Sequence, residues 1–258
     1  MTVLGTPYRL GATSYVWPAD LVPNVRRLGS LVDDVELVLF DVNGYSNLPD
    51  RSVAAELEAL AEEHELTYTV HLPLDLSLDQ PLALAKAEKV FDCTRDLSPW
   101  AYVLHLDGRA VEGEPSAAGL ARWREEAARV LDKVAALAGG EERLCVENLE
   151  NYAPEAFLPL LERLPVGLCV DVGHLWLKGR APLPFLRDHL ARTRVVHLHG
   201  VGERDHQSLR HQGAARVAPL LDLLSAAGYE GVLTLEVFSR EDFFSSRAVV
   251  AEVCHGPR

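Results

Sequence analysis

Histidine and carboxylate residues recur at the ends of short apolar runs from residue 71 of this 258-residue chain onward. Each stands in a different run; they are His71, His105, Glu147, Asp171, His197 and Glu236. Imidazole and carboxylate groups are ligands for Zn, Mn, Fe or Co, and they also act as general acids and bases. If the six side chains converge, three carboxylates repel one another unless a cation lies between them. The spacing therefore predicts a divalent metal site, with a salt-bridged structural cluster as the alternative.

The residue two positions before each of these candidates is small or apolar. These residues are Thr69, Val103, Cys145, Cys169, Val195 and Thr234. Side chains two apart on a strand point to the same face. Each strand is therefore expected to bury the small or apolar side chain in the interior and to present the ionisable side chain, on the same face, at its carboxyl end. Cys145 and Cys169 are accordingly predicted to be core residues rather than ligands.

Further polar and aromatic residues lie close to these run ends. His174 comes three residues after Asp171, His199 two after His197, and His206 lies in the segment from Arg204 to Leu209. His174 and His206 are predicted to bind a metal or the substrate, although a solvated loop residue is the alternative for His206. Expected substrate contacts also include Tyr15, Trp17, Tyr45, Asn148, Tyr152, Trp176 and His199. For the aromatic residues, packing of the loops is the alternative role.

Eight short apolar runs alternate with eight amphipathic segments along the chain. The predicted strands are Tyr8–Ser14, Val35–Phe40, Tyr68–Leu72, Tyr102–Leu106, Leu144–Glu147, Gly167–Asp171, Val195–Leu198 and Val232–Glu236. The predicted helices are Pro18–Leu28, Val53–His64, Leu82–Leu97, Ala117–Leu137, Pro154–Leu164, Pro184–Ala191, Ala214–Ala227 and Arg240–Val253. Strict alternation indicates a parallel sheet, and eight pairs in about 250 residues indicate a closed (β/α)8 TIM barrel. We expect a single domain over residues 1–258, with the active site at the carboxyl ends of the strands.

The composition disfavours several classes of partner. The formal net charge is −13, from 25 Lys+Arg against 38 Asp+Glu, so the overall field repels nucleic acid. No segment reads as a signal peptide or a membrane span. The four cysteines form no CxxC pair, which indicates reduced thiols and a cytoplasmic protein. The expected partner is a small-molecule substrate, with no nucleic acid and no membrane.

At four strand ends the chain resembles the superfamily of xylose-isomerase-like and apurinic-endonuclease-like TIM barrels. The matching motifs are Val146-Glu147-Asn148, Asp171-Val172-Gly173-His174, Val196-His197-Leu198-His199 and Leu235-Glu236. This resemblance implies a four-ligand metal site at Glu147, Asp171, His197 and Glu236. The hydrolytic branch of the superfamily implies further ions at His71, His105, His174 and His206. An acid is expected two residues before the last histidine, and Arg204 stands there instead. That departure favours one or two ions over three. The cofactor expected overall is one to three divalent ions, and the mixed imidazole and carboxylate ligands favour Zn or Mn, with Fe or Co as alternatives.

The N-terminal half is similar to the cobamide-remodelling phosphodiesterases within this superfamily. The motifs that carry the likeness are Arg9–Tyr15, Pro18–Asp20, Val32–Phe40, Ser46–Pro49 and Tyr68–Asp75. This likeness implies a metal-dependent hydrolase that cleaves the phosphodiester of the nucleotide loop of a cobamide. Glu147, Glu236, His174 and Arg204 are then the expected catalytic residues, with Arg204 neutralising phosphate charge.

The main alternative is a sugar or sugar-phosphate isomerase or epimerase with one divalent metal. In that case Glu147 and Glu236 would act as paired acid and base beside a carbonyl. An apurinic DNA endonuclease and a non-catalytic ligand-binding module remain less favoured alternatives, and the net charge of −13 argues against the endonuclease. Metal content per chain separates the two main hypotheses, since one ion favours an isomerase and two or more favour a hydrolase.

Overall fold

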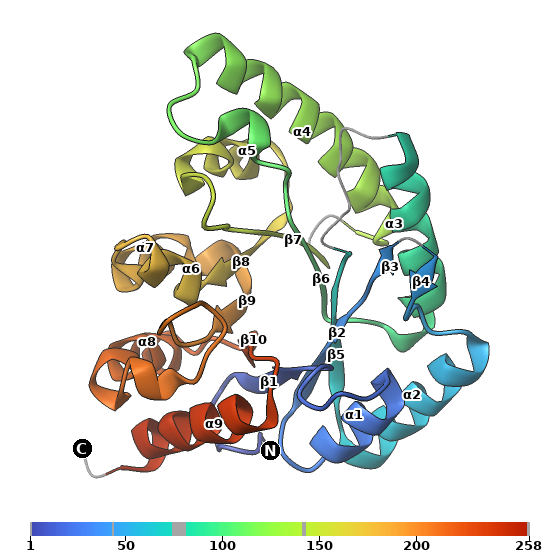
Figure 1. Cartoon of the computed structure of the whole chain (residues 1–258), viewed down its shortest axis with the longest axis vertical. Coiled ribbons are helices and arrows are strands. Elements are labelled where there is room, and N and C mark those ends of the chain that lie inside the picture. The colour runs from blue at the N-terminus through green and yellow to red at the C-terminus, as the bar shows by residue number, and fades with distance from the viewer. Residues whose placement is uncertain (1, 43, 74–80, 141–142, 257–258) are drawn as a thin grey trace.

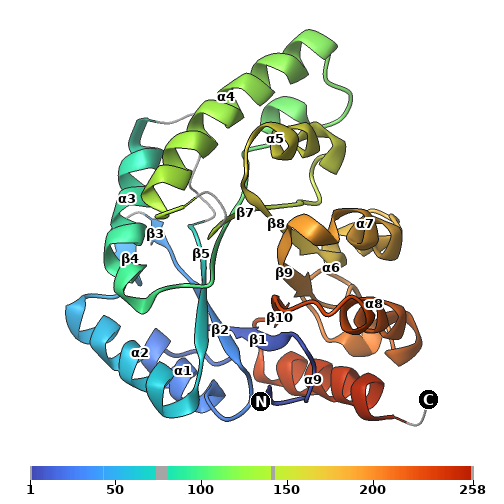
Figure 2. The ribbon, with the colours of Figure 1, turned by 180° about the vertical axis from the view of Figure 1, so that it is seen from behind.

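Eight parallel strands pair in a closed ring (Figures 1 and 2). The computed structural model describes residues 2–42, 44–73, 81–140 and 143–256. The barrel strands are β1 (Arg9–Thr13), β2 (Asp34–Val38), β5 (Thr67–His71), β6 (Ala101–Leu104), β7 (Leu144–Glu147), β8 (Gly167–Asp171), β9 (Thr193–Leu198) and β10 (Val232–Leu235). They follow the chain order around the ring, and β10 pairs with β1 to close it. The predicted (β/α)8 barrel is confirmed.

Helices surround the ring on the outside (Figure 1). They are α1 (Leu21–Leu28), α2 (Arg51–His64), α3 (Pro81–Thr94), α4 (Ala117–Leu137), α5 (Leu158–Arg163), α6 (Val172–Leu177), α7 (Pro182–His189), α8 (Ala214–Ala226) and α9 (Arg240–His255). Short 3-10 turns extend several of them, such as Arg95–Leu97 after α3 and Pro154–Ala156 before α5. Eight of the helices correspond to predicted segments, and the bounds of α4 agree at both ends.

Two features were not predicted. A hairpin of β3 (Asp41–Val42) and β4 (Tyr45–Ser46) follows β2, and strands of two residues are too short to show an alternating pattern. The short helix α6 begins directly after Asp171, whose Oδ1 accepts the backbone N–H of His174 at 2.6 Å. A six-residue helix that follows a strand without a loop leaves no turn signal in the sequence.

Side-chain caps explain where several helices begin. The carboxylate of Asp50 accepts the backbone N–H groups of Ser52 and Val53, so α2 begins two residues before the predicted start. Ser239 caps α9 in the same way by accepting the backbone N–H of Asp242. A cap of this kind stabilises a helix by about 1 kcal/mol because it satisfies an N–H that has no partner within the helix.

The interior of the barrel is apolar on one side and polar on the other. Its apolar side is a small cluster separate from the large core under the helices, formed by Ala101, Val103, Cys145, Cys169 and Val195. The polar side belongs to β1, β2, β5 and β10, and its fully buried members include Thr13, Asp34, Glu36, Thr69 and Thr234. The small or apolar residues two positions before the ligand candidates are therefore all buried, and Cys145 and Cys169 are core residues as expected. All four cysteines are free thiols.

None of the described helices combines the length and the apolar character that a bilayer span requires.

The core that binds the helices to the barrel is continuous around the ring. It includes large side chains with almost no exposed surface, such as Tyr8, Tyr68, Phe91, Phe157 and Phe243.

Candidate metal centre

Four ligand-type side chains meet at the carboxyl ends of neighbouring strands. Glu147 ends β7, Asp171 ends β8, His197 lies near the end of β9, and Glu236 follows β10 directly. One ligand atom from each lies within 4.8 Å of those of the others, and all four residues are buried. The Nδ1 atom of His197 lies 3.2 Å from Glu236 Oε2, 3.6 Å from Glu147 Oε1 and 3.9 Å from Asp171 Oδ2. The four residues that the family resemblance implied as principal ligands therefore lie close together in the structure.

The same four atoms have no hydrogen-bond partner in the part of the chain that the structure describes. They are Glu147 Oε1, Asp171 Oδ2, His197 Nδ1 and Glu236 Oε2. Leaving one buried polar atom unsatisfied costs about 1–3 kcal/mol, and more for a charged one. Three carboxylates and one imidazole facing a common point fit a divalent cation, which would satisfy every one of these atoms.

A second group uses the other oxygen of Glu147. His71 Nε2 lies 3.2 Å and His105 Nε2 3.0 Å from Glu147 Oε2. His71 Nδ1 donates to the backbone oxygen of Leu72 at 2.8 Å, so both ring nitrogens of His71 face oxygen atoms. Although burial opposes the charged ring, the contact with Glu147 raises the pKa of His71 to about 9. His71 is therefore either an imidazolium paired with Glu147 or a ligand of a second cation.

A third group consists of His174, His199 and His206, whose rings pack against one another. The backbone N–H of His206 donates to His199 Nδ1 at 2.9 Å, which places the remaining ring proton of a neutral His199 on Nε2. That nitrogen faces Asp171 Oδ1 at 3.3 Å. His206 adopts φ 49°, a strained backbone for a residue with a side chain, so the loop is held in place to make this contact.

The substrate role predicted for His199 does not agree with this placement. His199 is fully buried and contacts Asp171. Asp171 is one of the four residues that we call the cage: Glu147, Asp171, His197 and Glu236. His199 does not line the pocket that opens above this cage. Asn148 behaves similarly, because its side-chain oxygen accepts the backbone N–H of Asp171 and its amide donates to the Asp171 carbonyl, both at 2.9 Å. Both side chains position Asp171.

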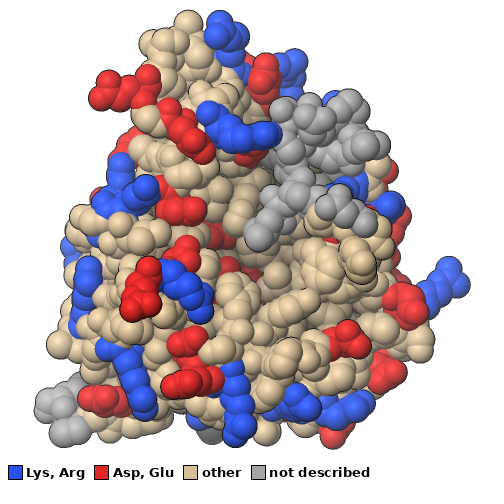
Figure 3. Space-filling view, in the orientation of Figure 1, with Lys and Arg blue, Asp and Glu red and all other residues tan. Residues whose placement is uncertain are grey.

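A pocket of about 410 Å³ opens above the cage. Its acidic lining residues are Glu147, Glu150, Asp205 and Glu236, and its apolar lining residues are Val38, Leu149 and Phe238. No Lys or Arg of the described ranges lines it. Figure 3 shows acidic side chains in the hollow near the centre of this face. The pocket is therefore of small-molecule size, and its four carboxylates share the lining with His71, His105, His174 and His206.

The predicted aromatic residues do not line this pocket. Trp176 lies in a different groove, where Arg216 stacks on its ring at 5.1 Å. Tyr152 is buried, and its hydroxyl donates to the backbone oxygen of Leu106. Tyr45 is 77% exposed on the β3–β4 hairpin. The alternative role of loop packing fits Trp176 and Tyr152 better than substrate contact.

Three more predicted residues lie on the periphery. Tyr15 packs near Phe40 with ring centroids 6.5 Å apart, and Trp17 packs edge-on against Phe244 at 6.4 Å. The guanidinium of Arg204 donates to the backbone oxygen of Asp205, and Arg204 is exposed outside the pocket lining. The structure therefore gives no support to the phosphate-neutralising role that was expected of Arg204.

Glu36 on β2 was missed as a site residue. It is fully buried inside the barrel, and its Oε1 lies 3.0 Å from His197 Nε2. The signal was an acidic residue inside an otherwise apolar run, Val35–Phe40. An acid in such a run indicates that the carboxylate needs a partner. The pattern does not identify the partner, because His197 is 161 residues away in the sequence.

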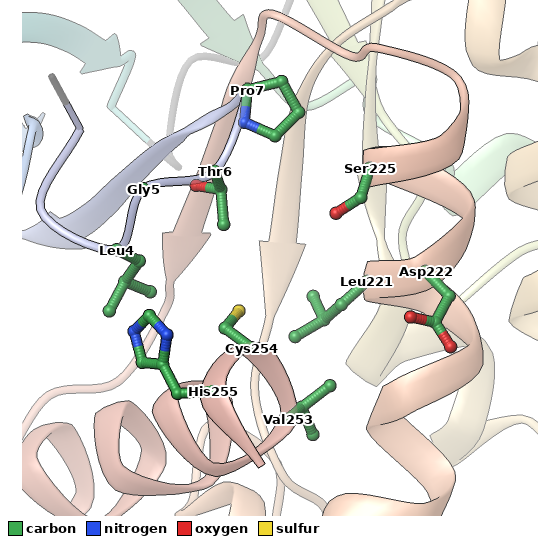
Figure 4. A pocket seen from close by; sticks show the side chains of 10 residues that line it. All are labelled: Leu4, Gly5, Thr6, Pro7, Leu221, Asp222, Ser225, Val253, Cys254 and His255. Atoms are coloured by element: carbon green, nitrogen blue, oxygen red, sulfur yellow. The ribbon is translucent and has the colours of Figure 1, made fainter. Parts of the chain in front are cut away.

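A second pocket of about 380 Å³ lies at the opposite end of the barrel (Figure 4). It is lined by the segment before β1 and by the last turns of α8 and α9, including Asp222, Cys254 and His255. In barrels of this type the amino end of the strands serves stability rather than catalysis. The ionisable cage lies at the other end.

The closed ring and the cage at its carboxyl end define a (β/α)8 barrel with a histidine–carboxylate cluster that could hold a metal ion. Residues 23–254 match the family described as Xylose isomerase-like TIM barrel, and the chain belongs to that family. A search of curated proteins finds no significant match in sequence.

Several solved structures share the fold. A D-tagatose 3-epimerase-like protein is 19% identical with a TM-score of 0.77, over 95% of this chain and 96% of that one. A 3-keto-D-glucoside 4-epimerase from E. coli is 17% identical with a TM-score of 0.68, over 95% and 98%. An L-ribulose 3-epimerase is 19% identical with a TM-score of 0.67, over 96% and 91%.

These comparisons correct the expected reaction. The similar structures are named as sugar epimerases, and none of the three is named as a phosphodiesterase. The prediction of a cobamide phosphodiesterase is therefore wrong, and the comparisons favour the alternative of a sugar isomerase or epimerase. The likeness of the N-terminal motifs gave the wrong reaction because residues such as Val32–Phe40 form a barrel strand and its flanks. Enzymes that catalyse different reactions can share such a strand.

Proposed function

We propose that this protein is a divalent-metal-dependent isomerase or epimerase of a small sugar. The observation that carries the proposal is the set of four unpartnered, buried ligand atoms at the strand ends, two of which belong to the carboxylates Glu147 and Glu236. The names of the similar structures support the choice of reaction. Glu147, Asp171, His197 and Glu236 would hold the ion, for which Zn or Mn suits the ligand set best.

The reaction requires a proton to leave and return at a carbon next to a carbonyl. A bound divalent ion would polarise that carbonyl and make the neighbouring C–H more acidic. One of Glu147 and Glu236 would accept the proton, and the other would deliver a proton to the opposite face of the same carbon. The net change for an epimerase is inversion at that carbon; for an isomerase the proton returns instead to the former carbonyl carbon, and the carbonyl moves to the neighbouring carbon.

The surroundings of Glu147 keep this carboxylate ionised. Burial opposes its charge, but His105 and His197 hold the pKa of Glu147 well below its ordinary value. We propose one ion per chain, with His71 as an imidazolium that holds Glu147 Oε2 at 3.2 Å. If the protein bound two ions per chain, His71, His105 and Glu147 would hold the second ion, and His71 would be a ligand rather than an imidazolium.

The charge of the pocket favours an uncharged sugar over a sugar phosphate. The acidic lining residues Glu150 and Asp205 lie outside the four-residue cage and remain negative after an ion binds. No described Lys or Arg lines the pocket, and residues 74–80, whose placement is not described, contain none in their sequence. The basic groups of the described lining are histidines, and two of them already face these acids: His174 Nε2 lies 3.6 Å from Glu150 Oε2 and His206 Nε2 lies 3.8 Å from Asp205 Oδ2. A phosphate dianion would therefore meet carboxylates without a Lys or Arg partner from the described residues.

The test is proton exchange at the substrate carbon. The metal-loaded protein is incubated in D₂O with a panel of ketoses and with their phosphate esters, and deuterium incorporation is followed by NMR. We expect exchange and a new epimer with at least one free ketose, and rates at least about tenfold lower with its phosphate ester, equivalent to about 1.4 kcal/mol. Protein with stoichiometric metal that exchanges no proton in any sugar would overturn the proposal.

Matched variants locate the chemistry. Glu147→Gln and Glu236→Gln should each lower the exchange rate by at least about 100-fold, the usual contribution of a positioned acid or base. Glu125→Gln is the control, because this exposed carboxylate pairs with Arg163 and does not belong to the cage or the pocket lining. Equal losses in the control would show that the variants act through folding.

A further inference from the structure

Glu36 makes its contact with His197 across the inside of the barrel. Glu36 lies on β2 and His197 on β9, and two strands, β1 and β10, separate them in the ring. Backbone pairing therefore does not bring the two residues together; only their side chains meet, at 3.0 Å between Oε1 and Nε2. Both side chains are fully buried.

We infer that Glu36 is a positioning residue of the metal centre, which orients the His197 ring so that the Nδ1 lone pair points into the carboxylate cage. The inference rests on the metal centre of the proposed function, and it does not depend on which reaction the centre performs.

The hydrogen-bonding roles follow from the chemistry of the two groups. When Glu36 is a carboxylate it can only accept, and the proton of the contact then belongs to His197 Nε2. A neutral imidazole has one N–H, and Nδ1 then carries the lone pair. Nδ1 is the ring atom that has no hydrogen-bond partner and lies 3.2 Å from Glu236 Oε2. Glu36 thus selects the one tautomer that can bind a cation at the cage.

Geometry gives the contact a second effect. A histidine ring can rotate about the bond that joins it to Cβ, and rotation would exchange the positions of its nitrogen and carbon atoms. The Glu36 contact fixes one edge of the ring, and the strand register that pairs His197 with Asp171 and Thr234 fixes its backbone. Carboxylates that orient a metal-binding histidine in this way typically raise metal affinity by about 10–100-fold.

Three variants separate positioning from folding. Glu36→Leu keeps the volume and removes the acceptor, whereas Glu36→Gln keeps an oxygen that can accept the Nε2 proton. Asp34→Asn is the matched control, because Asp34 is also a fully buried acid of β2 but bonds Thr67 instead of His197. Zn²⁺ affinity is measured by competition with a chromophoric chelator, and folding is checked by circular dichroism.

We expect Glu36→Leu to weaken Zn²⁺ binding by about 10–100-fold. Glu36→Gln should fall between this variant and the wild type, and Asp34→Asn should stay within about threefold of the wild type. A folded Glu36→Leu protein with wild-type affinity would overturn the inference, as would an equal loss in Asp34→Asn.

A second measurement uses the wild-type protein and needs no variant to fold. Nitrogen-15 NMR of the Zn²⁺-loaded protein should show His197 protonated at Nε2 and not at Nδ1. A proton on Nδ1 would overturn the inference directly. Neither readout involves turnover, so protein that binds Zn²⁺ through His197 but epimerises no sugar would reject the proposed reaction and leave the role of Glu36 intact.

Discussion

Asn148 and Asp171 hold each other through two hydrogen bonds between the ends of β7 and β8. Asn148→Ala would leave the Asp171 N–H and carbonyl without these partners inside the protein. We expect the free energy of unfolding to fall by about 2–3 kcal/mol, measured by urea denaturation of the metal-free protein. Asn151→Ala is the control, because Asn151 bonds an exposed carboxylate, and it should change stability by less than about 0.5 kcal/mol. Equal effects of the two changes would contradict the prediction.

Asp34 should make the free energy of unfolding depend on pH. Burial raises the pKa of this carboxyl from 3.8 to about 7, although Thr67 donates to it. Between these two values the unfolded chain loses the proton and the folded protein keeps it, so this group makes stability fall as the pH rises from about 4 to about 7. The slope reaches at most about 1.4 kcal/mol per pH unit.

Asp34→Asn removes this titration. Urea denaturation of the variant and the wild type at several pH values between 4.5 and 8 isolates the contribution, because other titrating groups are common to both. The stability of the variant relative to the wild type should increase with pH up to about 7 and then level off. Parallel curves would show that Asp34 titrates normally in the folded protein.

At the scale of elements, the junction of β8 with α6 depends on a glycine. A Cβ atom on Gly173 would lie 2.1–2.4 Å from three atoms of the His199 ring, and His199 contacts the cage residue Asp171. Gly173→Ala should therefore displace His199, cost about 1–3 kcal/mol of stability, and weaken metal binding. Thermal unfolding and Zn²⁺ titration measure the two effects.

Gly119→Ala near the start of α4 is the matched control for Gly173→Ala. Among the described residues the added Cβ would meet Ser116 Oγ, at 3.2 Å, and α4 lies on the outside of the barrel. Its stability should change by less than about 1 kcal/mol, and its metal affinity should not change. Unaltered metal binding in Gly173→Ala would show that His199 does not support Asp171.

At the scale of the whole molecule, an ion in the cage would connect four consecutive strands, β7 to β10. Each strand contributes one of the four unpartnered atoms, so removing the ion leaves repulsion between three carboxylates at one end of the ring. Binding to the folded state alone stabilises it by about 2.7 kcal/mol when free metal is 100 times Kd. We expect a chelator to lower the melting temperature by several degrees, and added Zn²⁺ or Mn²⁺ to restore it.

Asp171→Asn tests whether that shift comes from the cage. The variant loses a charged ligand and should bind metal weakly, so the chelator should hardly change its melting temperature. Differential scanning fluorimetry of both proteins provides the measurement. If the wild type melts at the same temperature with and without chelator, the unpartnered atoms do not hold an ion under those conditions.

The strands that carry the cage were predictable because their local pattern agrees with their tertiary role. The observed bounds of β7 and β8 are those predicted, and both strands end on the predicted ligand, Glu147 or Asp171. Aromatic residues beyond the strand ends were less predictable. Trp176 in α6 and Tyr152 in the loop after β7 come five residues after a strand end, but their direction depends on packing against Arg216 or Trp123, which no local pattern records.

The sequence alone determined the barrel and the end of it that carries ionisable groups, because strand alternation and parity are local periodic properties, and its motifs implied the four cage residues through their resemblance to a family. The tertiary structure decided which atoms of those residues lack partners, that Asn148 and His199 support Asp171, and that Glu36 contacts His197. These features arise between residues far apart in the chain, where closure of the ring sets the distances and periodicity carries no information.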